Sequence, residues 1–333
     1  MKKITIGDVA KHANVSKSTV SQYLNKRYEY MSERTRERIA ASIEELDYRP
    51  NIVARSLKQK STFTIGVIVA NILHSFSTQI IRAIENKFHE QGFHIIVCNA
   101  DDEPDKEKDY IEMLMAKQVD GIIIFPTGGN VSLYEQMKKS AFPIVFMDRT
   151  IEDIEIETVV LDNDRAAQLA IDQFVENGYR KIAIVTTSII RNISPRLERI
   201  QGYKNALERH QIQVNPAYIK TAEPDMLYQS LEELFVSEEP PQAILAANDI
   251  VLMEVLKYIK KYDMKIPTNI AVIGIDEVPF ASFYTPSLTT ISQPTIEMAH
   301  LAVKLLIDQI NKEETRKPSV YRLQPTLIQR GSC

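Results

Sequence analysis

The sequence contains little cysteine and no long apolar run. Its two cysteines, Cys98 and Cys333, lie far apart among 333 residues, which indicates neither a disulfide framework nor a zinc site. No apolar run approaches the roughly 18 residues that span a bilayer. The first residues, MKKIT, lead directly into polar helical sequence without the apolar stretch of a signal peptide. We therefore expect a cytoplasmic protein with no membrane segment.

Motifs of nucleotide-dependent enzymes are also missing. There is no G-x-G-x-x-G and no G-x-x-x-x-G-K-[ST], and Gly128-Gly129 is interpreted as a turn. The six histidines show no zinc spacing, and His89 and His94 straddle Gly92, so they do not share a helical face. We expect no catalytic residue, no metal and no cofactor. An enzyme on the same fold stays the main alternative class.

Length and charge divide the chain into a small and a large part. A chain of 333 residues is long enough for two or three domains. Residues 1–60 carry a net charge of +6 and residues 61–333 a net charge of −10. A basic head on an acidic body suggests that the head meets a polyanion, although a solvated helical surface is the simpler interpretation.

The pattern inside the head favours nucleic acid. Thr5, Ser16 and Ser32 are each suited to cap a short helix. The apolar stripes of these helices consist of Ile6, Val9, Ala10 and Ala13, then Val20 and Leu24, then Ile39, Ile43 and Leu46. Three short helices with a tight turn at Asn14-Val15 form a helix-turn-helix unit, whose second helix enters the major groove.

Polar residues occupy the leading edge of that second helix. Lys17 can donate to guanine and Gln22 can pair with adenine, and Ser18 lies on the same edge. Further short donors are suited to phosphate oxygens: Ser16, Thr19, Ser21 and Asn25. Capping by serine and threonine and a solvated lysine would explain any one of these residues, but explain the whole set less well.

The head resembles the lactose/galactose repressor (LacI/GalR) family. The matching segments are Thr5-Ile6-Gly7-Asp8-Val9-Ala10, Val15-Ser16-x-x-Thr19-Val20-Ser21, Leu24-Asn25, Thr35-Arg36 and Tyr48-Arg49-Pro50-Asn51. The resemblance implies DNA contacts by Thr5, Tyr48 and Asn51 as well. Asn14 replaces a frequent glycine and tolerates a left-handed turn. Gln22 replaces a frequent arginine, which puts the usual guanine contact in doubt and suggests a shifted operator sequence.

Residues 50–58 resemble the hinge helix of that family. A helix of this length does not persist alone in water, and the resemblance implies that it orders on DNA and pairs with its copy in a homodimer. Leu57 would be the wedge that opens a base step in the minor groove, with Ala54 and Arg55 along the groove. Packing of Leu57 against the body is the alternative.

The body alternates strands and helices. Apolar runs predict strands at 64–70, 94–100, 121–126, 144–148, 182–186, 243–247 and 270–276, and amphipathic stretches predict helices at 77–91, 106–118, 162–177, 196–210, 249–262 and 295–312. The prediction is an all-α head, residues 1–60, and an α/β two-lobed body with parallel sheets, residues 61–333. Lobe 1 is expected at about 61–160 and 292–322, and lobe 2 at 161–291 and 323–333.

Ligands of such folds bind beyond the carboxyl ends of the strands. The body resembles the periplasmic-binding-protein-like effector domain of the same family in motifs such as Asp162-Asn163, Arg199-x-x-Gly202-Tyr203, Ala247-Asn248-Asp249 and Gly274-x-Asp276. That resemblance and the strand ends give the expected effector contacts: His74, Phe76, Ser77, Asp148, Arg149, Arg196, Arg199, Asn248, Asp276 and Gln293. Helix capping is the alternative for Asp148 and Asp276, and surface ion pairing for each arginine.

The expected partners are a near-palindromic double-stranded operator, a small effector and a second copy of the chain. Carboxylates accept from sugar hydroxyls, and Arg199, with help from Arg149, Arg191 and Arg196, matches an acid group. We therefore expect a sugar or sugar acid as effector; segments 21–25 and 28–32 are similar to regulators of ketodeoxygluconate use. The end of the chain shows no heptad repeat, so we expect a dimer. A secreted solute-binding protein, or a regulator tuned by a phosphoprotein, remains open.

Overall fold

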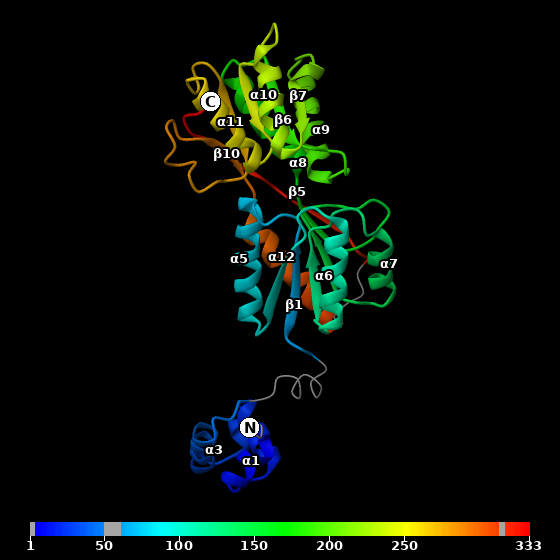
Figure 1. Ribbon diagram of the computed structural model, residues 1–333, viewed down its shortest axis with the longest axis vertical. Helices are drawn as coiled ribbons and strands as arrows, with labels where there is room; N and C mark the ends of the chain where they lie inside the picture. The colour runs from blue at the N-terminus through cyan, green and yellow to red at the C-terminus, as the bar shows by residue number, and fades with distance from the viewer. Residues whose placement is uncertain (1–3, 50–60, 313–316) are drawn as a thin grey trace. The chain divides into compact units, whose positions relative to one another are not determined.

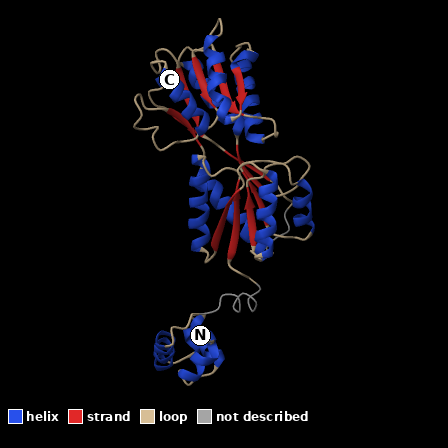
Figure 2. Cartoon of the chain, in the orientation of Figure 1, coloured by secondary structure: helices blue, strands red, loops and turns tan. Residues whose placement is uncertain are grey.

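A computed structural model describes residues 4–49, 61–312 and 317–333. The chain forms two compact units, Met1–Thr62 and Phe63–Cys333, here called the head and the body. Figure 1 shows their elements by colour, and Figure 2 shows the helical head and the mixed helices and strands of the body. Among the described residues, no helix has the length and apolar character needed to cross a membrane.

The head is a cluster of short capped helices. They are α1 (Ile6–His12), α2 (Lys17–Leu24) and α3 (Glu33–Glu45), with a 3-10 turn at Tyr28–Tyr30. Thr5, Ser16 and Ser32 accept hydrogen bonds from the first-turn amides, so all three expected caps are confirmed. Their apolar sides meet in one core formed by Val9, Ala10, Ala13, Val20, Ile39 and Tyr48. Asn14 takes a left-handed φ of 50° between α1 and α2, as its side chain permits.

The first lobe of the body contains a six-stranded parallel sheet. Its strands are β1 (Thr64–Val69), β2 (His94–Asn99), β3 (Gly121–Ile124), β4 (Ile144–Met147), β5 (Thr158–Leu161) and β11 (Val320–Leu323), in the order β11-β5-β4-β3-β1-β2. The helices around it are α5 (Ser75–Glu90), α6 (Pro104–Ala116), α7 (Val131–Lys139) and α12 (Thr295–Asn311). In Figure 1 the orange α12 lies among the cyan and green elements, because the chain returns to this lobe late.

The second lobe repeats this plan. Its strands are β6 (Ile182–Thr187), β7 (Ile219–Ala222), β8 (Ala243–Ala246), β9 (Ala271–Ile275), β10 (Thr289–Ser292) and β12 (Thr326–Ile328), in the order β12-β10-β9-β8-β6-β7. Only β12 is antiparallel to its neighbour. The helices are α8 (Asn163–Glu176), α9 (Ser194–Arg209), α10 (Leu227–Val236) and α11 (Asp249–Lys261). The predicted fold class, a helical head and two parallel α/β lobes, is confirmed.

Three segments connect the lobes: β5 to α8, β10 to α12, and β11 to β12. The sequence pattern missed the strands near these crossovers, which are β5, β10, β11 and β12. It also missed β7, α7 and α10. The missed strands β10, β11 and β12 mix polar and apolar residues over at most four positions, which is too little periodicity to distinguish a strand from a loop. The crossovers place Gln293, which follows β10, directly between the two lobes.

Candidate functional site

The exposed edge of α2 carries the residues expected to contact bases. Lys17 and Ser18 are exposed and Gln22 is half-buried, while Val20 on the opposite side is fully buried. The Lys17 side chain lies along Gly7 of α1, since a Cβ added at Gly7 would stand 3.0 Å from its Cε. A side chain at position 7 would therefore move the lysine. The fold thus presents a cation at the start of α2, the helix that we expect to enter the groove.

The other expected DNA contacts in the head also have structural roles. The Ser16 hydroxyl accepts from the amide of Thr19 at 3.1 Å, and Asn25 donates to the carbonyl of Ser21 at 2.8 Å. Thr5 forms a capping box with Asp8. Tyr48 is only 8% exposed and packs in the core of the head, where burial raises its pKa. The predicted contacts Asn51, Ala54, Arg55 and Leu57 lie outside the described residues.

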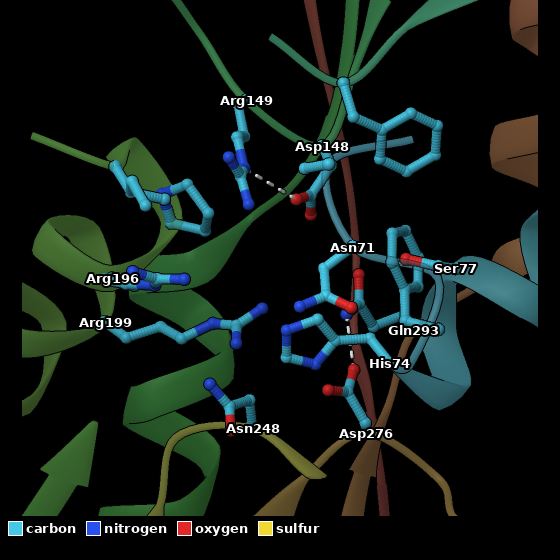
Figure 3. A pocket seen from close by; sticks show the side chains of 15 residues that line it. Asn71, His74, Ser77, Asp148, Arg149, Arg196, Arg199, Asn248, Asp276 and Gln293 are labelled. Carbon is cyan, nitrogen blue, oxygen red and sulfur yellow. Dashed lines mark hydrogen bonds and ion pairs between the residues drawn. The ribbon is translucent and has the colours of Figure 1, made fainter. Parts of the chain in front are cut away.

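A cavity between the two lobes collects every expected effector residue (Figure 3). It encloses about 480 Å³ of space free of protein atoms, part of it open to solvent. The sequence reasoning missed five of its lining residues: Ala70, Asn71, Phe125, Ile193 and Pro195. Asn71 lies two residues after β1 and Phe125 directly follows β3, so the strand-end rule that found Asp148 could have found them. Arg191, an expected helper, does not line this cavity.

Asp148 and Arg149 are charged residues of the first lobe that line the cavity. Asp148 directly follows β4 in a left-handed conformation, with φ of 69°, and caps no helix. Arg149 Nη1 lies 2.7 Å from Asp102 Oδ1, and its Nε lies 3.6 Å from Asp148 Oδ2. Arg149 is therefore buried among carboxylates and is not a surface ion pair. A left-handed aspartate at a strand end is a strained conformation of the kind that binding sites contain.

Arg199 and Asp276 are charged residues of the second lobe that line the same cavity. Asp276 follows β9 with φ of 92°, and likewise caps no helix. Burial raises the pKa of Asp276, and the Arg199 charge opposes that rise. Gln293 donates to the Asp276 carboxylate at 2.6 Å, while its own buried Oε1 accepts from no described group. Asn248 caps α11 and donates to Thr187 at 3.2 Å. These carboxylate, amide and guanidinium groups can bind a polyhydroxylated ligand.

His74 links the two lobes across the cavity. Its Nδ1 lies 2.6 Å from Asp249 Oδ1, and the Ser75 amide donates to the other oxygen of that carboxylate at 2.5 Å. His74 was expected as an effector contact, and it also spans from the start of α5 to the start of α11. Burial opposes ionisation of Asp249, but its bonds to His74 and Ser75 lower its pKa overall. Sequence reasoning missed Asp249 as the partner of His74, because 175 residues separate them.

A chain of hydrogen bonds connects the cavity to the crossovers. Arg199 Nε donates to Asn163 Oδ1 at 2.8 Å, and Asn163 donates to Glu198 at 2.8 Å. Glu198 in turn accepts from Arg322 of β11 at 2.9 Å. Two of the three crossovers therefore contact the helix that carries Arg199. A change at Arg199 can pass to the segments about which the lobes would rotate.

The whole chain is similar to bacterial transcriptional regulators. Residues 5–51 match the profile of the bacterial regulatory proteins of the lacI family, and residues 171–333 match that of the periplasmic binding protein-like domain. A probable HTH-type transcriptional regulator, EndR of Paenibacillus polymyxa, is 45% identical over 332 residues, covering 98% of each chain. The HTH-type transcriptional repressor PurR of Aliivibrio salmonicida is 32% identical over 331 residues, again covering 98% of each chain.

Solved structures agree with this result. The Lac repressor bound to ONPG is 26% identical, with a TM-score of 0.86 and full coverage of both chains. The Lac repressor dimer bound to operator and the anti-inducer ONPF is also 26% identical, with a TM-score of 0.83 and 99% coverage of each. This chain belongs to the lacI family of bacterial regulatory proteins. It is a DNA-binding transcriptional regulator of the helix-turn-helix class and not an enzyme.

Proposed function

We propose that the protein is a cytoplasmic repressor of sugar or sugar-acid catabolism genes and that a carbohydrate-like effector in the interlobe cavity controls its operator affinity. The observation that supports this most is the convergence of Asp148, Arg199, Asn248 and Asp276 from both lobes on one cavity. The hydroxyl groups of a sugar can pair with carboxylates, amides and guanidinium groups. The rings of Phe76 and Phe125, with centroids 6.2 Å apart, add an apolar wall for one face of a sugar ring.

Effector binding would act on DNA affinity through lobe rotation. A ligand that pairs with Asp148 and Arg199 changes the contacts between lobes, and the Asn163–Glu198–Arg322 chain carries this change to the crossovers. Two chains in a homodimer would then alter the separation of their hinge segments, residues 50–58. The solved operator complex of the Lac repressor is a dimer, which supports this arrangement. Linkage requires that operator and effector change each other's affinity by the same factor.

Operator binding in the presence of effectors tests this proposal. First, duplexes selected from a random pool by the purified chain define the operator. Fluorescence anisotropy with that duplex is then measured with and without each member of a panel: glucose, galactose, gluconate, galacturonate and 2-keto-3-deoxygluconate. We expect at least one member to change operator affinity about 5- to 150-fold, the usual range of allosteric coupling.

Arg199→Gln provides the matched loss of function. We expect that variant to bind operator normally and to lose the response, because Arg199 lies in the cavity of the body and the DNA-contacting residues lie in the head. Arg180→Gln is the control, since Arg180 is exposed in the same lobe and its side chain donates to the carbonyls of Val175 and Tyr179. Absence of a selected operator, or an Arg199→Gln variant with an intact response, would contradict the proposal.

A further inference from the structure

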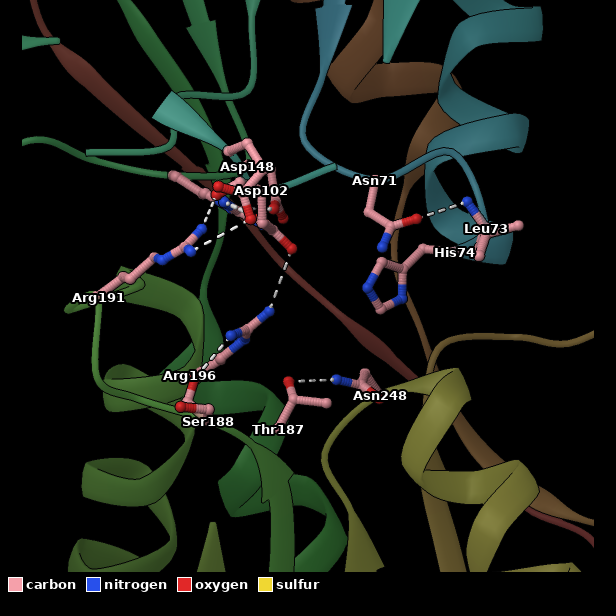
Figure 4. Close-up of polar contacts among 12 residues, drawn as sticks. Asn71, Leu73, His74, Asp102, Asp148, Thr187, Ser188, Arg191, Arg196 and Asn248 are labelled. Carbon is pink, nitrogen blue, oxygen red and sulfur yellow. Dashed lines mark hydrogen bonds and ion pairs between the residues drawn. The ribbon is translucent and has the colours of Figure 1, made fainter. Parts of the chain in front are cut away.

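We propose that Arg149 and Arg196 form a subsite for the acid group of the effector, and that Asp102 determines its specificity by competing for the two guanidinium groups. This inference rests on the proposed function and narrows it, because it names an acidic ligand over a neutral sugar. Asp102 was not expected from the sequence and lies just behind the cavity, where Figure 4 shows it beside Asp148 and above Arg196.

The two arginines come from opposite lobes and meet at one carboxylate. Arg149 follows β4 of the first lobe, and its Nη1 lies 2.7 Å from Asp102 Oδ1. Arg196 belongs to α9 of the second lobe, and its Nη2 lies 3.7 Å from Asp102 Oδ2. Both arginines also line the cavity. A ligand in the cavity therefore reaches the same two groups from the opposite side.

Arg149 is incompletely hydrogen-bonded within this cluster. Asp102 Oδ1 is buried, and its partner is Arg149 Nη1 at 2.7 Å. Arg149 Nε is buried as well and donates to no described acceptor. Buried polar groups without partners are costly and are expected to bind when a suitable group arrives. A carboxylate or phosphate offers acceptors for forked guanidinium donors.

Asp102 is a counter-charge of both arginines. The buried Arg149 and the partly buried Arg196 share its carboxylate, and Asp148 Oδ2 lies 3.6 Å from Arg149 Nε. Burial lowers the pKa of Arg196 to about 10, and the positive charge of Arg149 contributes to this shift. Burial opposes ionisation of Asp102, but Arg149 and Arg196 together lower its pKa. Among the carboxylates near Arg196, Asp102 raises its pKa more than Asp148 and Glu223 do. Removal of the Asp102 carboxylate therefore leaves the two guanidinium groups with less negative charge beside them, which favours another anion.

Asp102 can be removed without backbone strain. Its φ is 58°, a left-handed conformation that glycine adopts without steric strain. The neighbouring Asp101 has φ of 52° and pairs with Lys106 and Asn99 on the surface, away from the two arginines. Asp102→Gly and Asp101→Gly are therefore a matched pair that differ in which carboxylate is lost. Arg191, which donates to the Asp102 carbonyl but does not line the cavity, provides a matched arginine control.

Rescue by a small carboxylate tests the subsite directly. Thermal unfolding of the full chain is measured in sodium formate and in sodium chloride at equal ionic strength. We expect formate to raise the Tm of Asp102→Gly by about 2 °C or more over chloride, because it binds only the folded state. Asp101→Gly and the double variant Asp102→Gly/Arg196→Gln should show no such difference, whereas Asp102→Gly/Arg191→Gln should retain it. No formate effect, or the same effect in Asp101→Gly, would overturn the proposal.

Neutral sugars and the corresponding sugar acids test whether Asp102 determines the specificity for an acid group. Asp102→Asn keeps the volume of the side chain and removes the competing charge. We expect it to tighten binding of galacturonate or gluconate about tenfold, while galactose and glucose do not gain. Glucose 6-phosphate separates a phosphate preference from a carboxylate preference. If neutral sugars change operator affinity and acids do not, this inference is wrong and the proposed function stands. If no member of either class changes operator affinity, the proposed function fails, whatever formate does.

Discussion

At the scale of single residues, burial of an ionisable side chain in the cavity lowers the stability of the folded chain. Asp276 is buried beside Arg199 and Gln293, and burial raises its pKa above the ordinary value of 3.8. Its ionised form is thus less stable in the folded chain than in the unfolded chain. As pH rises from 3.8 through the folded-state pKa, the chain loses stability through this group. Such a cost is usual where a residue serves binding.

Asp276→Asn should therefore stabilise the body and abolish the effector response. The amide keeps the volume and an acceptor for Gln293 without a buried charge. We expect a gain of about 1 kcal/mol at pH 7, which shrinks towards pH 4 because the wild-type carboxyl is then protonated. Thermal unfolding at several pH values measures this difference. Asp225→Asn, an exposed site in the same lobe, should show no change, and an Asp276→Asn variant less stable at pH 7 would contradict the argument.

Lys17 is the residue of the head whose substitution gives the most specific prediction for DNA binding. It is exposed at the start of α2 and lies along Gly7. Lys17→Ala should either lower the slope of log affinity against log salt by about 1, if the lysine contacts a phosphate, or relax one base position, if it contacts guanine. Anisotropy titrations over a salt series with operator and single-base variants measure both. Lys11→Ala, an exposed control on α1, should change neither quantity, and an unchanged Lys17→Ala variant would reject a groove contact.

At the scale of elements, the crossing of α8 and α9 sets the position of Arg199. The two helices pack against each other, and Gly202 of α9 faces the backbone of Asp164 in α8. A Cβ added at Gly202 would stand 2.7 Å from the Cα and 2.8 Å from the carbonyl oxygen of Asp164. Both contacts are with backbone atoms, which cannot move aside as a side-chain tip can. Glycine is required here for space, one turn after Arg199.

Gly202→Ala should push the two helices apart. We expect a loss of about 1 to 3 kcal/mol, the range for overpacking in a filled core, together with weaker effector binding because α9 carries Arg199. Chemical denaturation and effector titration measure the two effects. Gln201→Ala, an exposed site one residue earlier in the same helix, is the control and should be nearly neutral. Equal stability of Gly202→Ala and wild type would show that the crossing relaxes easily.

At the scale of the whole molecule, regulation requires that the body influence the head. The body contains two lobes that contact each other through His74 and Asp249 and through the groups around Asp102. The head and the body are separate compact units. Residues 50–60, which include Leu57, connect the two units in the sequence. The resemblance predicts that this segment forms a helix on DNA and inserts Leu57 between bases.

Leu57→Ser should weaken specific binding more than non-specific binding. An apolar wedge contributes only where the duplex is bent, and bending accompanies the specific complex. Anisotropy with operator and with random duplex at the same salt concentration measures the two affinities. Ser56→Ala, at the neighbouring position, is the control with little expected change. Equal weakening on both duplexes would exclude the wedge and favour packing of Leu57 against the body.

The sequence by itself determined the local elements and the class of protein. Capping residues such as Thr5 and Ser16, and apolar stripes such as Val9 and Val20, specify short helices because their interactions lie within a few residues. The alternation of runs specified parallel α/β lobes, and the strand-end rule together with the family resemblance brought all ten expected effector residues to one cavity. The sequence did not predict the short strands β5, β10, β11 and β12, because they form through hydrogen bonds to neighbouring strands of the sheet that are distant in the sequence.

Tertiary structure alone decided which charges meet. His74 pairs with Asp249, and Arg149 and Arg196 share Asp102, yet nothing along the chain distinguishes these carboxylates from their neighbours. Asp101 and Asp102 are adjacent and chemically identical, but Asp101 pairs with a surface lysine, whereas the half-buried Asp102 pairs with arginines of both lobes. Ion pairing depends on distance and burial in three dimensions, and those follow from the packing of two lobes through three crossovers.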